Sequence, residues 1–296
     1  MRFSHLIEIG SAGSGNVSRN ICVKTEMSNR KVIMNTIIRL MRRLDRLTTC
    51  LRYLNLRTTL ELFLLRNVPA TPRRAVLRNR QTPFFYRGYA DCGVMSHFYI
   101  EGYEIVSAST EVKWIIDLGA NIGDETVKFA LRHPKASILA IEPEGENFKL
   151  LVANSKVFSP RIFPLHCGIW WRDARLNIRP GPTNESFTVE EAPAGSIKGR
   201  CIRSLMNEFG IEQIDILKID IEGAEFELFK DGVEDWLPAV RSVVIEISDH
   251  ERAGSMQNFF RAFEKLELKF DFFICGENLV GLSQNGGLEF KKSTGI

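Results

Sequence analysis

The part of the chain that follows Glu111 alternates short apolar runs with amphipathic segments, and this order restricts the fold most. The runs with strand character are residues 114–119, 137–142, 162–167, 214–220 and 240–247. Several are apolar on both faces, as strands are when helices cover both sides of a parallel sheet. Helical spacing is found in residues 124–133, 145–155, 202–210, 224–232 and 256–266. This β-α-β-α order predicts a doubly wound α/β sheet, to which residues 268–275 and 279–283 can add two strands.

The residues before this region have a different sequence pattern. Apolar residues recur every three or four positions over about residues 30–57, which predicts an amphipathic helix, and residues 68–88 combine three prolines with five arginines, as a linker does. Residues 1–29 show no periodicity. We therefore expect residues 1–88 to form a basic N-terminal extension and residues 89–296 to form the main domain.

Charge is distributed unevenly between the two parts of the chain. Residues 1–110 hold 17 Lys and Arg against 7 Asp and Glu, whereas residues 111–296 hold 22 against 29. The arginines of the expected helix 30–57 suit anionic lipid headgroups at a membrane surface, nucleic acid or water alone. We favour a solvated helix, with peripheral membrane contact as the alternative. Nucleic acid is not expected as a partner, because no aromatic and basic interleaving marks a recognition surface.

Composition is that of an ordinary soluble protein. Hydrophobic residues make up 44% of the 296 residues and charged residues 25%, and no apolar run reaches the length of about 18 residues that spans a bilayer. The first residues contain Glu8 inside their only apolar patch and no hydrophobic stretch of signal-peptide length, so we expect a cytoplasmic protein. The six cysteines and five histidines are dispersed, without metal-ligand spacing, and no metal site is predicted.

The sharpest local signal is the sequence WIIDLGANIGDETVKFAL at residues 114–131. It is an apolar strand that enters a glycine turn, which in turn opens an amphipathic helix. Gly119 and Gly123 lack a Cβ, so the turn can adopt tight backbone angles and a ligand can approach the main chain. Ligands of open α/β sheets bind beyond the carboxyl ends of the strands, which is where this turn is expected.

Two acidic residues indicate which ligand the turn binds. Glu142 ends the second strand, 25 positions after Asp117, and a carboxylate there can accept hydrogen bonds from both hydroxyls of a ribose. The glycines are spaced G-x-x-x-G rather than G-x-G-x-x-G, and Asp117 puts negative charge where a pyrophosphate would be repelled. S-adenosylmethionine has no phosphate and carries an ammonium and a sulfonium that a carboxylate attracts.

A second signal is the sequence IDILKIDIEGAEFELF at residues 214–229. Asp220 ends a buried strand at the ligand edge of the sheet, and Glu222 and Glu225 follow at the turn into a helix. Three carboxylates this close repel one another unless they meet cations, hydrogen-bond donors or water, which favours a ligand-facing cluster. Acids in a first helical turn are also favoured by the helix dipole, so Glu222 and Glu225 have a purely structural interpretation as well.

The residues of the first signal also have structural interpretations. The two glycines are compatible with strand-to-helix packing alone, Asp117 with a helix cap and Glu142 with an exposed strand end. Their joint order and spacing favour the binding site.

These segments together resemble the FkbM family of S-adenosylmethionine-dependent methyltransferases. The resemblance rests on IDLGANIGD (116–124), AIEPEGENFKLLVAN (140–154), residues 202–232 and VVIEIS (243–248), with DCGVMSHFYIEGYEI (91–105) as a lead-in. It extends from about Asp91 to Gly281 and leaves out the first ninety residues, while residues 170–187 follow no common pattern.

The resemblance implies a seven-stranded Rossmann-like methyltransferase that acts on a hydroxyl of a sugar, a polyketide or another small metabolite. It implies that S-adenosylmethionine is bound by three groups of residues, which are Asp117, Gly119, Ala120, Asn121 and Gly123, then Glu142 and Pro143, and finally the stretch His166–Ile169 with Cys167 and Gly168. Asp220 would lie near the transferred methyl group. We expect Asp220, with Glu222 or His250, to act as the base or to orient the acceptor.

Two other functions stay open at this point. An NAD(P)-dependent Rossmann oxidoreductase is disfavoured by the missing third glycine and by Asp117. A non-catalytic nucleotide-binding or interaction module, which keeps the fold and binds a partner, is disfavoured by the intact cofactor residues. The acceptor and the oligomeric state do not follow from the sequence.

Overall fold

The structure is a computed structural model of the whole chain, and it describes residues 72–76, 82–87, 91, 103–107, 111–180, 187–247, 249 and 252–292. The chain divides into two compact units, Met1–Thr48 and Thr49–Ile296, and all described residues belong to the second. The expected helix 30–57 lies outside the described residues, so its membrane contact stays a prediction. The expected boundary between residues 88 and 89 also falls outside them and stays a prediction.

The described part of the chain consists of strands, helices and short 3-10 turns. The strands are β1 (Arg73–Val76), β2 (Pro83–Tyr86), β3 (Tyr103–Ser107), β4 (Trp114–Leu118), β5 (Ser137–Glu142), β6 (Ile162–His166), β7 (Gly168–Ile169), β8 (Ala174–Pro180), β9 (Phe187–Glu191), β10 (Ile197–Arg200), β11 (Ile216–Ile219), β12 (Ser242–Glu246), β13 (Phe270–Cys275), β14 (Asn278–Ser283) and β15 (Leu288–Lys292). The helices are α4 (Asp124–Arg132), α5 (Gly145–Ser155), α6 (Ile202–Phe209), α7 (Glu225–Leu228) and α8 (Ser255–Lys265), with short 3-10 turns η1 (Lys156–Phe158), η2 (Val233–Asp235) and η3 (Leu237–Ala239).

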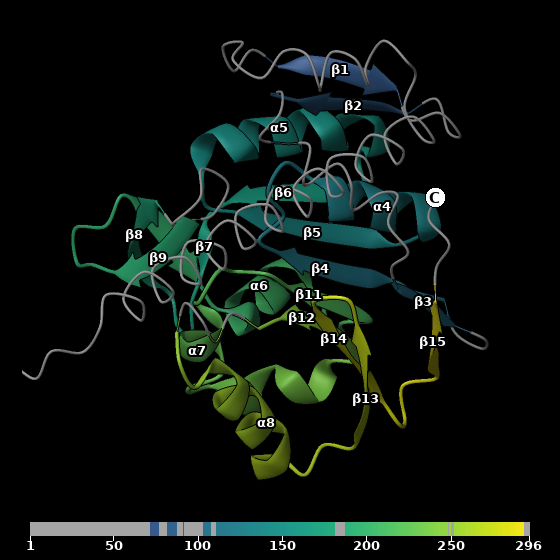
Figure 1. Cartoon of the computed structure of the whole chain (residues 1–296), viewed down its shortest axis with the longest axis vertical. Coiled ribbons are helices and arrows are strands. Elements are labelled where there is room, and N and C mark those ends of the chain that lie inside the picture. The colour runs from purple at the N-terminus through teal and green to yellow at the C-terminus, as the bar shows by residue number, and fades with distance from the viewer. Residues whose placement is uncertain are drawn as a thin grey trace, which may run out of the picture. The chain divides into compact units, whose positions relative to one another are not determined.

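Seven strands form the central sheet in the order β13-β14-β12-β11-β4-β5-β6 (Figure 1). The pairs from β6 through β12 are parallel, and β14 is antiparallel to both of its neighbours. The doubly wound α/β sheet expected from the sequence is thereby confirmed, with all seven expected strands in one sheet. The chain runs outward from β4 through β5 to β6 and then crosses back to β11, so the strand order reverses at β4. Ligands of such sheets bind at this switch point.

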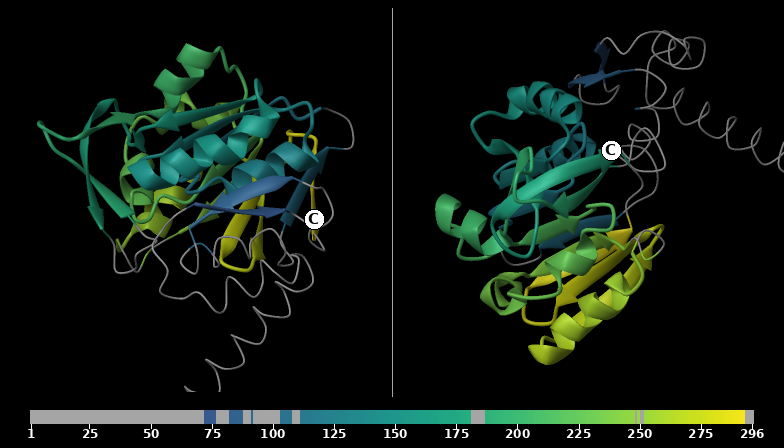
Figure 2. Two further views of the ribbon diagram at one scale, coloured as in Figure 1. Left: turned by 90° about the horizontal axis from the view of Figure 1, so that it is seen from above. Right: turned by 90° about the vertical axis from the view of Figure 1, so that its left-hand side faces the viewer.

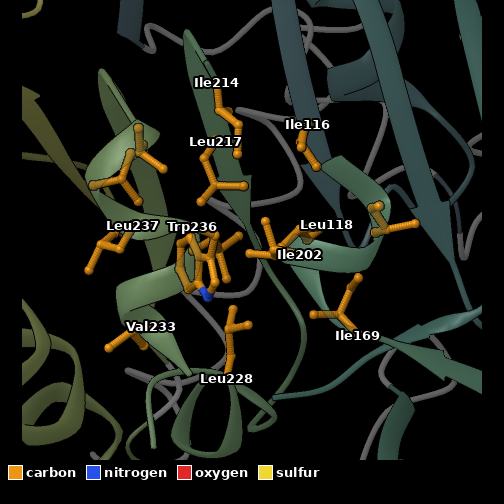
Figure 3. Packing of buried hydrophobic residues seen from close by; sticks show 14 of the residues in the cluster. Ile116, Leu118, Ile169, Ile202, Ile214, Leu217, Leu228, Val233, Trp236 and Leu237 are labelled. Atoms are coloured by element: carbon orange, nitrogen blue, oxygen red, sulfur yellow. The ribbon is translucent and has the colours of Figure 1, made fainter. Parts of the chain in front are cut away.

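Helices cover both faces of the central sheet, because its strands alternate between two apolar cores. Ile116 and Leu118 of β4 face a core with α6 and α8, whereas Ile115 faces a second core with α4 and α5. Figure 3 shows part of the first core, in which Trp236 packs among aliphatic side chains from several elements. Aromatic rings extend this core along the outer strands, where α8 lies beside β13 and β14 (Figure 2).

A second sheet of four strands, in the order β7-β10-β8-β9, is formed by residues between β6 and α6 (Figure 1). Its inner face contributes Leu176, which packs with Trp170 and Ala224 in a small core of its own. Sequence analysis did not anticipate this sheet, of which β8 lies in the stretch 170–187 that follows no common pattern. Across all described helices, none is long and apolar enough to cross a membrane.

The expected linker 68–88 contains the antiparallel strand pair β1 and β2. Phe84 and Tyr86 are buried, because the strand packs on α5 instead of running free as a linker. The backbone N–H of Phe85 donates to Asn154 Oδ1 at 2.6 Å, and Asn154 Nδ2 donates to the Phe85 carbonyl at 3.0 Å. The prolines and arginines of this segment led us to expect a linker, but the alternating apolar residues of β2 determine its structure.

We predict that Gly119→Ala unfolds the switch point. Gly119 has a φ of 78°, and a Cβ on it would lie 1.7 Å from the carbonyl oxygen of Asp220. The left-handed conformation alone costs a non-glycine residue about 1–2 kcal/mol, and the backbone overlap should bring the loss to on the order of 4 kcal/mol or more. Chemical denaturation measures this loss.

Gly210→Ala is the matched control. Gly210 has a φ of 64°, and nothing lies within 4 Å of the Cβ that would be added. We expect it to cost only the conformational strain of about 1–2 kcal/mol. Equal losses in the two variants would contradict the proposed close approach of Gly119 and Asp220.

Candidate functional site

A cleft opens beyond the carboxyl ends of β4, β5 and β11, at the switch point of the central sheet. The turns after these strands form one side, and Phe187 and Val189 from β9 of the second sheet contribute to the other. The residues that line the cleft are Gly119, Asn121, Ile141, Glu142, Pro143, Asn147, Ile169, Phe187, Val189, Asp220, Ile221 and Glu222.

The glycine turn after β4 is fixed to the end of β5 by its backbone. The N–H groups of Gly119 and Ala120 both donate to the carbonyl of Ile141, at 3.0 and 2.9 Å. Gly123, with a φ of 92°, packs against Leu151 of α5, and a Cβ on it would lie 2.9 Å from that side chain. The turn therefore presents Gly119 and Asn121 to the cleft, while Gly123 serves helix packing.

Glu142 stands at the end of β5 and joins two loops. Its side chain accepts hydrogen bonds from the backbone N–H groups of Asn121 and Glu144, each at 2.8 Å. The residue is 4% exposed, and this burial raises the pKa of its carboxyl group to about 7. A carboxylate has about four lone-pair sites, so acceptor capacity is left for a ligand hydroxyl.

Asp117 is fully buried behind the cleft and does not line it. Thr126 Oγ1 donates to its Oδ2 at 2.5 Å, and no described residue donates a hydrogen bond to its Oδ1. Burial raises the pKa of this carboxyl group to about 7, although the positive charge of Lys218 acts in the opposite direction. Asp117 is thus a buried residue beneath the glycine turn, and its side chain does not reach the cleft.

The turn after β11 contributes two carboxylates to the cleft. Asp220 lines it and accepts a hydrogen bond of 2.7 Å from Lys218 Nζ, which is itself buried. Glu222 lines the cleft in a left-handed conformation, with a φ of 48°. Glu225 points back instead and accepts from the N–H groups of Ile221 and Gly223, at 3.3 and 2.8 Å. Burial raises the pKa of Glu225 to about 7, and because its carboxyl group is bonded to these two amides and does not line the cleft, this residue holds the turn.

The structure brings together about half of the residues expected in the site. On the cleft are Gly119, Asn121, Glu142, Pro143, Asp220 and Glu222. Beside it but not on its surface are Asp117, Ala120, Gly123, Cys167 and Gly168. Ala120 and Cys167 belong to the two cores of the central sheet, and burial raises the pKa of the Cys167 thiol to about 12. His250 lies outside the described residues, and its catalytic role stays a prediction.

Sequence analysis missed five residues that line the cleft, which are Ile141, Asn147, Phe187, Val189 and Ile221. Asn147 comes from α5, where it shares the buried face with Leu150, Leu151 and Asn154. A polar residue on a buried helix face was the signal that could have identified it. Phe187 and Val189 come from the second sheet, and their position depends on a strand pairing that the sequence did not reveal.

The charged side chains that line the cleft are all acidic. The lining includes the three carboxyl side chains of Glu142, Asp220 and Glu222 and no Lys, Arg or His. Ile141, Ile169 and Phe187 give it an apolar portion. Such a surface suits a ligand with positive charge and a planar or apolar part, and it disfavours a pyrophosphate. Among the described residues, no group of three or more His, Cys, Asp or Glu side chains is arranged to hold a metal ion.

Residues 117–272 match the Methyltransferase FkbM domain, a match that covers more than half of the chain and includes the central switch point. The chain belongs to the FkbM methyltransferase family. Its resemblance to that family is thereby confirmed, and the fold is the Rossmann-like methyltransferase fold. The same match favours a methyltransferase over the oxidoreductase alternative.

Similar proteins include two curated methyltransferases. The hexuronic acid methyltransferase AglP of Haloferax volcanii is 28% identical over 139 residues, which cover 46% of this chain and 56% of AglP. The methyltransferase sdnD of Sordaria araneosa is 27% identical over 169 residues, which cover 45% of this chain and 65% of sdnD. The chain thus matches somewhat more than half of the length of these relatives. Among solved structures, the methyltransferase FkbM of Methylobacillus flagellatus is 17% identical with a TM-score of 0.41, over 58% of this chain and 43% of that one.

We predict that Asp117→Asn stabilises the protein at alkaline pH. The folded-state pKa of Asp117 is about 7 against an ordinary 3.8, so the folded chain holds this proton more tightly than the unfolded chain. Its contribution to stability is present at low pH and is lost as the pH rises through 7. Asparagine does not ionise. The advantage of the variant in thermal unfolding should therefore grow from pH 5 to pH 8 and reach a few kcal/mol.

Asp215→Asn is the control for this experiment. Asp215 is also buried, but Arg241 Nη1 donates to it at 2.5 Å and the N–H groups of Lys113 and Trp114 donate to its other oxygen. Neutralising a carboxylate that is fully paired should destabilise the protein at every pH tested. If Asp117→Asn lowers the melting temperature at pH 8 as Asp215→Asn does, the assignment of Asp117 is wrong.

Proposed function

We propose that the protein is an S-adenosylmethionine-dependent O-methyltransferase that acts on a hydroxyl group of a sugar or another small metabolite. The observation that carries the proposal is the acidic cleft at the switch point, in which Glu142 is held by two backbone amides and no cation is present on the described lining. Membership of a methyltransferase family supports it.

The residues present fit this cofactor. Glu142 would accept hydrogen bonds from the ribose hydroxyls, as acidic residues at this strand end do in dinucleotide folds. Ile141 and Ile169 offer an apolar surface for the adenine ring, and Asp220 or Glu222 attracts a positively charged group. When bound, S-adenosylmethionine supplies an electrophilic methyl group on a sulfonium. The cleft would hold it by charge and shape, without any phosphate contact.

The carboxylates at the end of β11 support a hydroxyl acceptor. Asp220 uses one oxygen for Lys218, and its other oxygen is available to accept the proton of a hydroxyl that lies in the cleft. An acceptor that presents its own carboxylate here would be repelled by Asp220 and Glu222. The relative named as a hexuronic acid methyltransferase supports the choice of a sugar, and the charge of this cleft supports a neutral hydroxyl on it.

We predict that Glu142→Gln weakens S-adenosylmethionine binding by about 10- to 100-fold. A glutamine has only one oxygen to accept hydrogen bonds, so either Asn121 N–H or Glu144 N–H would face an NH₂ group. Each such loss, together with the lost ribose contact, costs about 1–3 kcal/mol. Isothermal titration calorimetry of both proteins with S-adenosylmethionine and with NAD measures the effect.

The wild-type protein should bind S-adenosylmethionine and leave NAD unbound, which separates the proposed cofactor from a dinucleotide. Its affinity should also fall as the pH drops below about 7, because the carboxylate form of Glu142 is the better acceptor and its pKa is about 7. Tight binding of NAD, or equal affinities of wild type and Glu142→Gln at pH 8, would overturn the cofactor assignment.

We predict that Asp220→Asn lowers turnover by about 10²–10⁴-fold, the usual contribution of a positioned general base. An asparagine still accepts from Lys218 but does not take up a proton at neutral pH. Methyl transfer to a panel of neutral sugars, hexuronic acids and small hydroxyl compounds, measured at saturating cofactor, gives the turnover.

Glu222→Gln is the comparison, because Glu222 lines the same turn without the bond to Lys218. We expect it to lower turnover by only about tenfold. Cofactor affinity is measured separately for both variants. Unchanged turnover of Asp220→Asn would remove this residue from the chemistry, and a larger loss in Glu222→Gln would transfer the role of base to Glu222.

A further inference from the structure

Arg87 lies just after β2, well before the region 117–272 that matches the family, and it is anchored by a buried acid. Its backbone N–H donates to Asp91 Oδ2 at 2.5 Å, and its Nη2 donates to Asp91 Oδ1 at 3.0 Å. Asp91 is 1% exposed. A guanidinium with a buried, bidentate partner is held in one orientation, unlike one in a surface ion pair.

The same guanidinium reaches a residue that lines the cleft. Arg87 Nη2 donates to Asn147 Oδ1 at 2.5 Å, and Asn147 is only 3% exposed. Because a guanidinium has donors only, the amide oxygen of Asn147 must face Arg87, and its NH₂ group must face the other way. Asn147 and Glu142 both line the cleft, and while burial raises the pKa of the Glu142 carboxyl group, the Asn147 side chain acts as a donor in the opposite direction.

The strand before Arg87 is fixed to the same helix. Asn154 lies seven positions after Asn147, which is two turns along one face of α5, and it forms two hydrogen bonds with the backbone of Phe85. Thus β2 and the residue that follows it run along this face of α5. A series of hydrogen bonds then leads from Asp91 through Arg87 to Asn147, which lines the cleft together with Glu142.

We propose that Arg87 is a positioning residue of the cofactor site: held by Asp91, it orients the Asn147 amide, which in turn fixes the Glu142 carboxylate toward the ribose hydroxyls. The inference rests on the cofactor role proposed above for Glu142. The proposal adds to the cofactor site a residue that precedes the matched domain by about thirty positions. It also assigns Asn147 to the residues that contact the cofactor.

Arg87→Met tests the proposal in the full-length chain. We expect its dissociation constant and KM for S-adenosylmethionine to rise about tenfold, because Glu142 loses a fixed donor, while kcat at saturating cofactor stays within about twofold. Arg87→Lys should recover part of the affinity, since an ammonium can donate to Asp91 or Asn147 but lacks the planar fork. The double variant with Asn147→Leu should bind no more weakly than Asn147→Leu alone.

Arg161→Met is the control for a merely structural arginine. Arg161 donates to the carbonyls of Ala130, His133 and Ala136, none of which lines the cleft. It should lower stability and leave the cofactor affinity unchanged. If Arg87→Met behaves like Arg161→Met, or if its effect adds fully to that of Asn147→Leu, the positioning role is refuted.

A measurement without cofactor separates this inference from the proposed function. Carbon-13 NMR titration of Glu142 in the ligand-free protein should show a higher pKa in Arg87→Met than in wild type, because the Asn147 donor that stabilises the carboxylate is lost while the negative charge of nearby Glu144 stays. An unchanged pKa overturns the role of Arg87. If wild-type protein binds no S-adenosylmethionine, the proposed function fails, and the NMR titration still decides whether Arg87 orients Asn147.

Discussion

The close approach of two backbones at the switch point determines where every other part of the site lies. Gly119 leaves β4 so near to the end of β11 that a single methyl group would overlap the Asp220 carbonyl, and the Asp220 N–H donates to the carbonyl of Leu118 at 3.0 Å. On its other side the same turn is bonded to Ile141 of β5. The turn therefore joins three strand ends, and it brings Glu142 and Asp220, which follow the two neighbours of β4, to one cleft.

The carboxyl groups around this turn differ in role because they differ in the donors they meet. Glu142 and Glu225 each accept two backbone N–H groups, but Glu142 remains on the cleft while Glu225 is enclosed by its own turn. Asp117 meets one hydroxyl and is sealed from solvent. Burial raises the pKa of all three to about 7, so the pKa alone does not identify the binding residue. Of the three residues, Glu142 alone lines the cleft, and this position distinguishes it from Asp117 and Glu225.

The alternation of apolar and amphipathic segments was sufficient to predict the seven strands, because each strand carries its own signal of burial. It was also sufficient to bring Glu142 and Asp220 to one edge, since parallel strands end on the same side. It could not place Asp117, whose side chain points under the turn toward Thr126, or Cys167, which packs into a core. Asn147, Phe187 and Val189 were missed because their approach to the cleft depends on contacts between distant segments.

The distribution of charge and of backbone donors at the cleft fits the proposed cofactor, which has no phosphate. A dinucleotide needs free amides and no acid at the glycine turn, but here the N–H groups of Gly119 and Ala120 are already used by Ile141 and that of Asn121 by Glu142. The backbone N–H groups that would bind a phosphate are thus already hydrogen-bonded, and these bonds hold the turn to β5. The remaining surface of the cleft combines acidic and apolar side chains, and it suits the cationic nucleoside proposed above, because burying an anion beside Glu142 and Asp220 is costly.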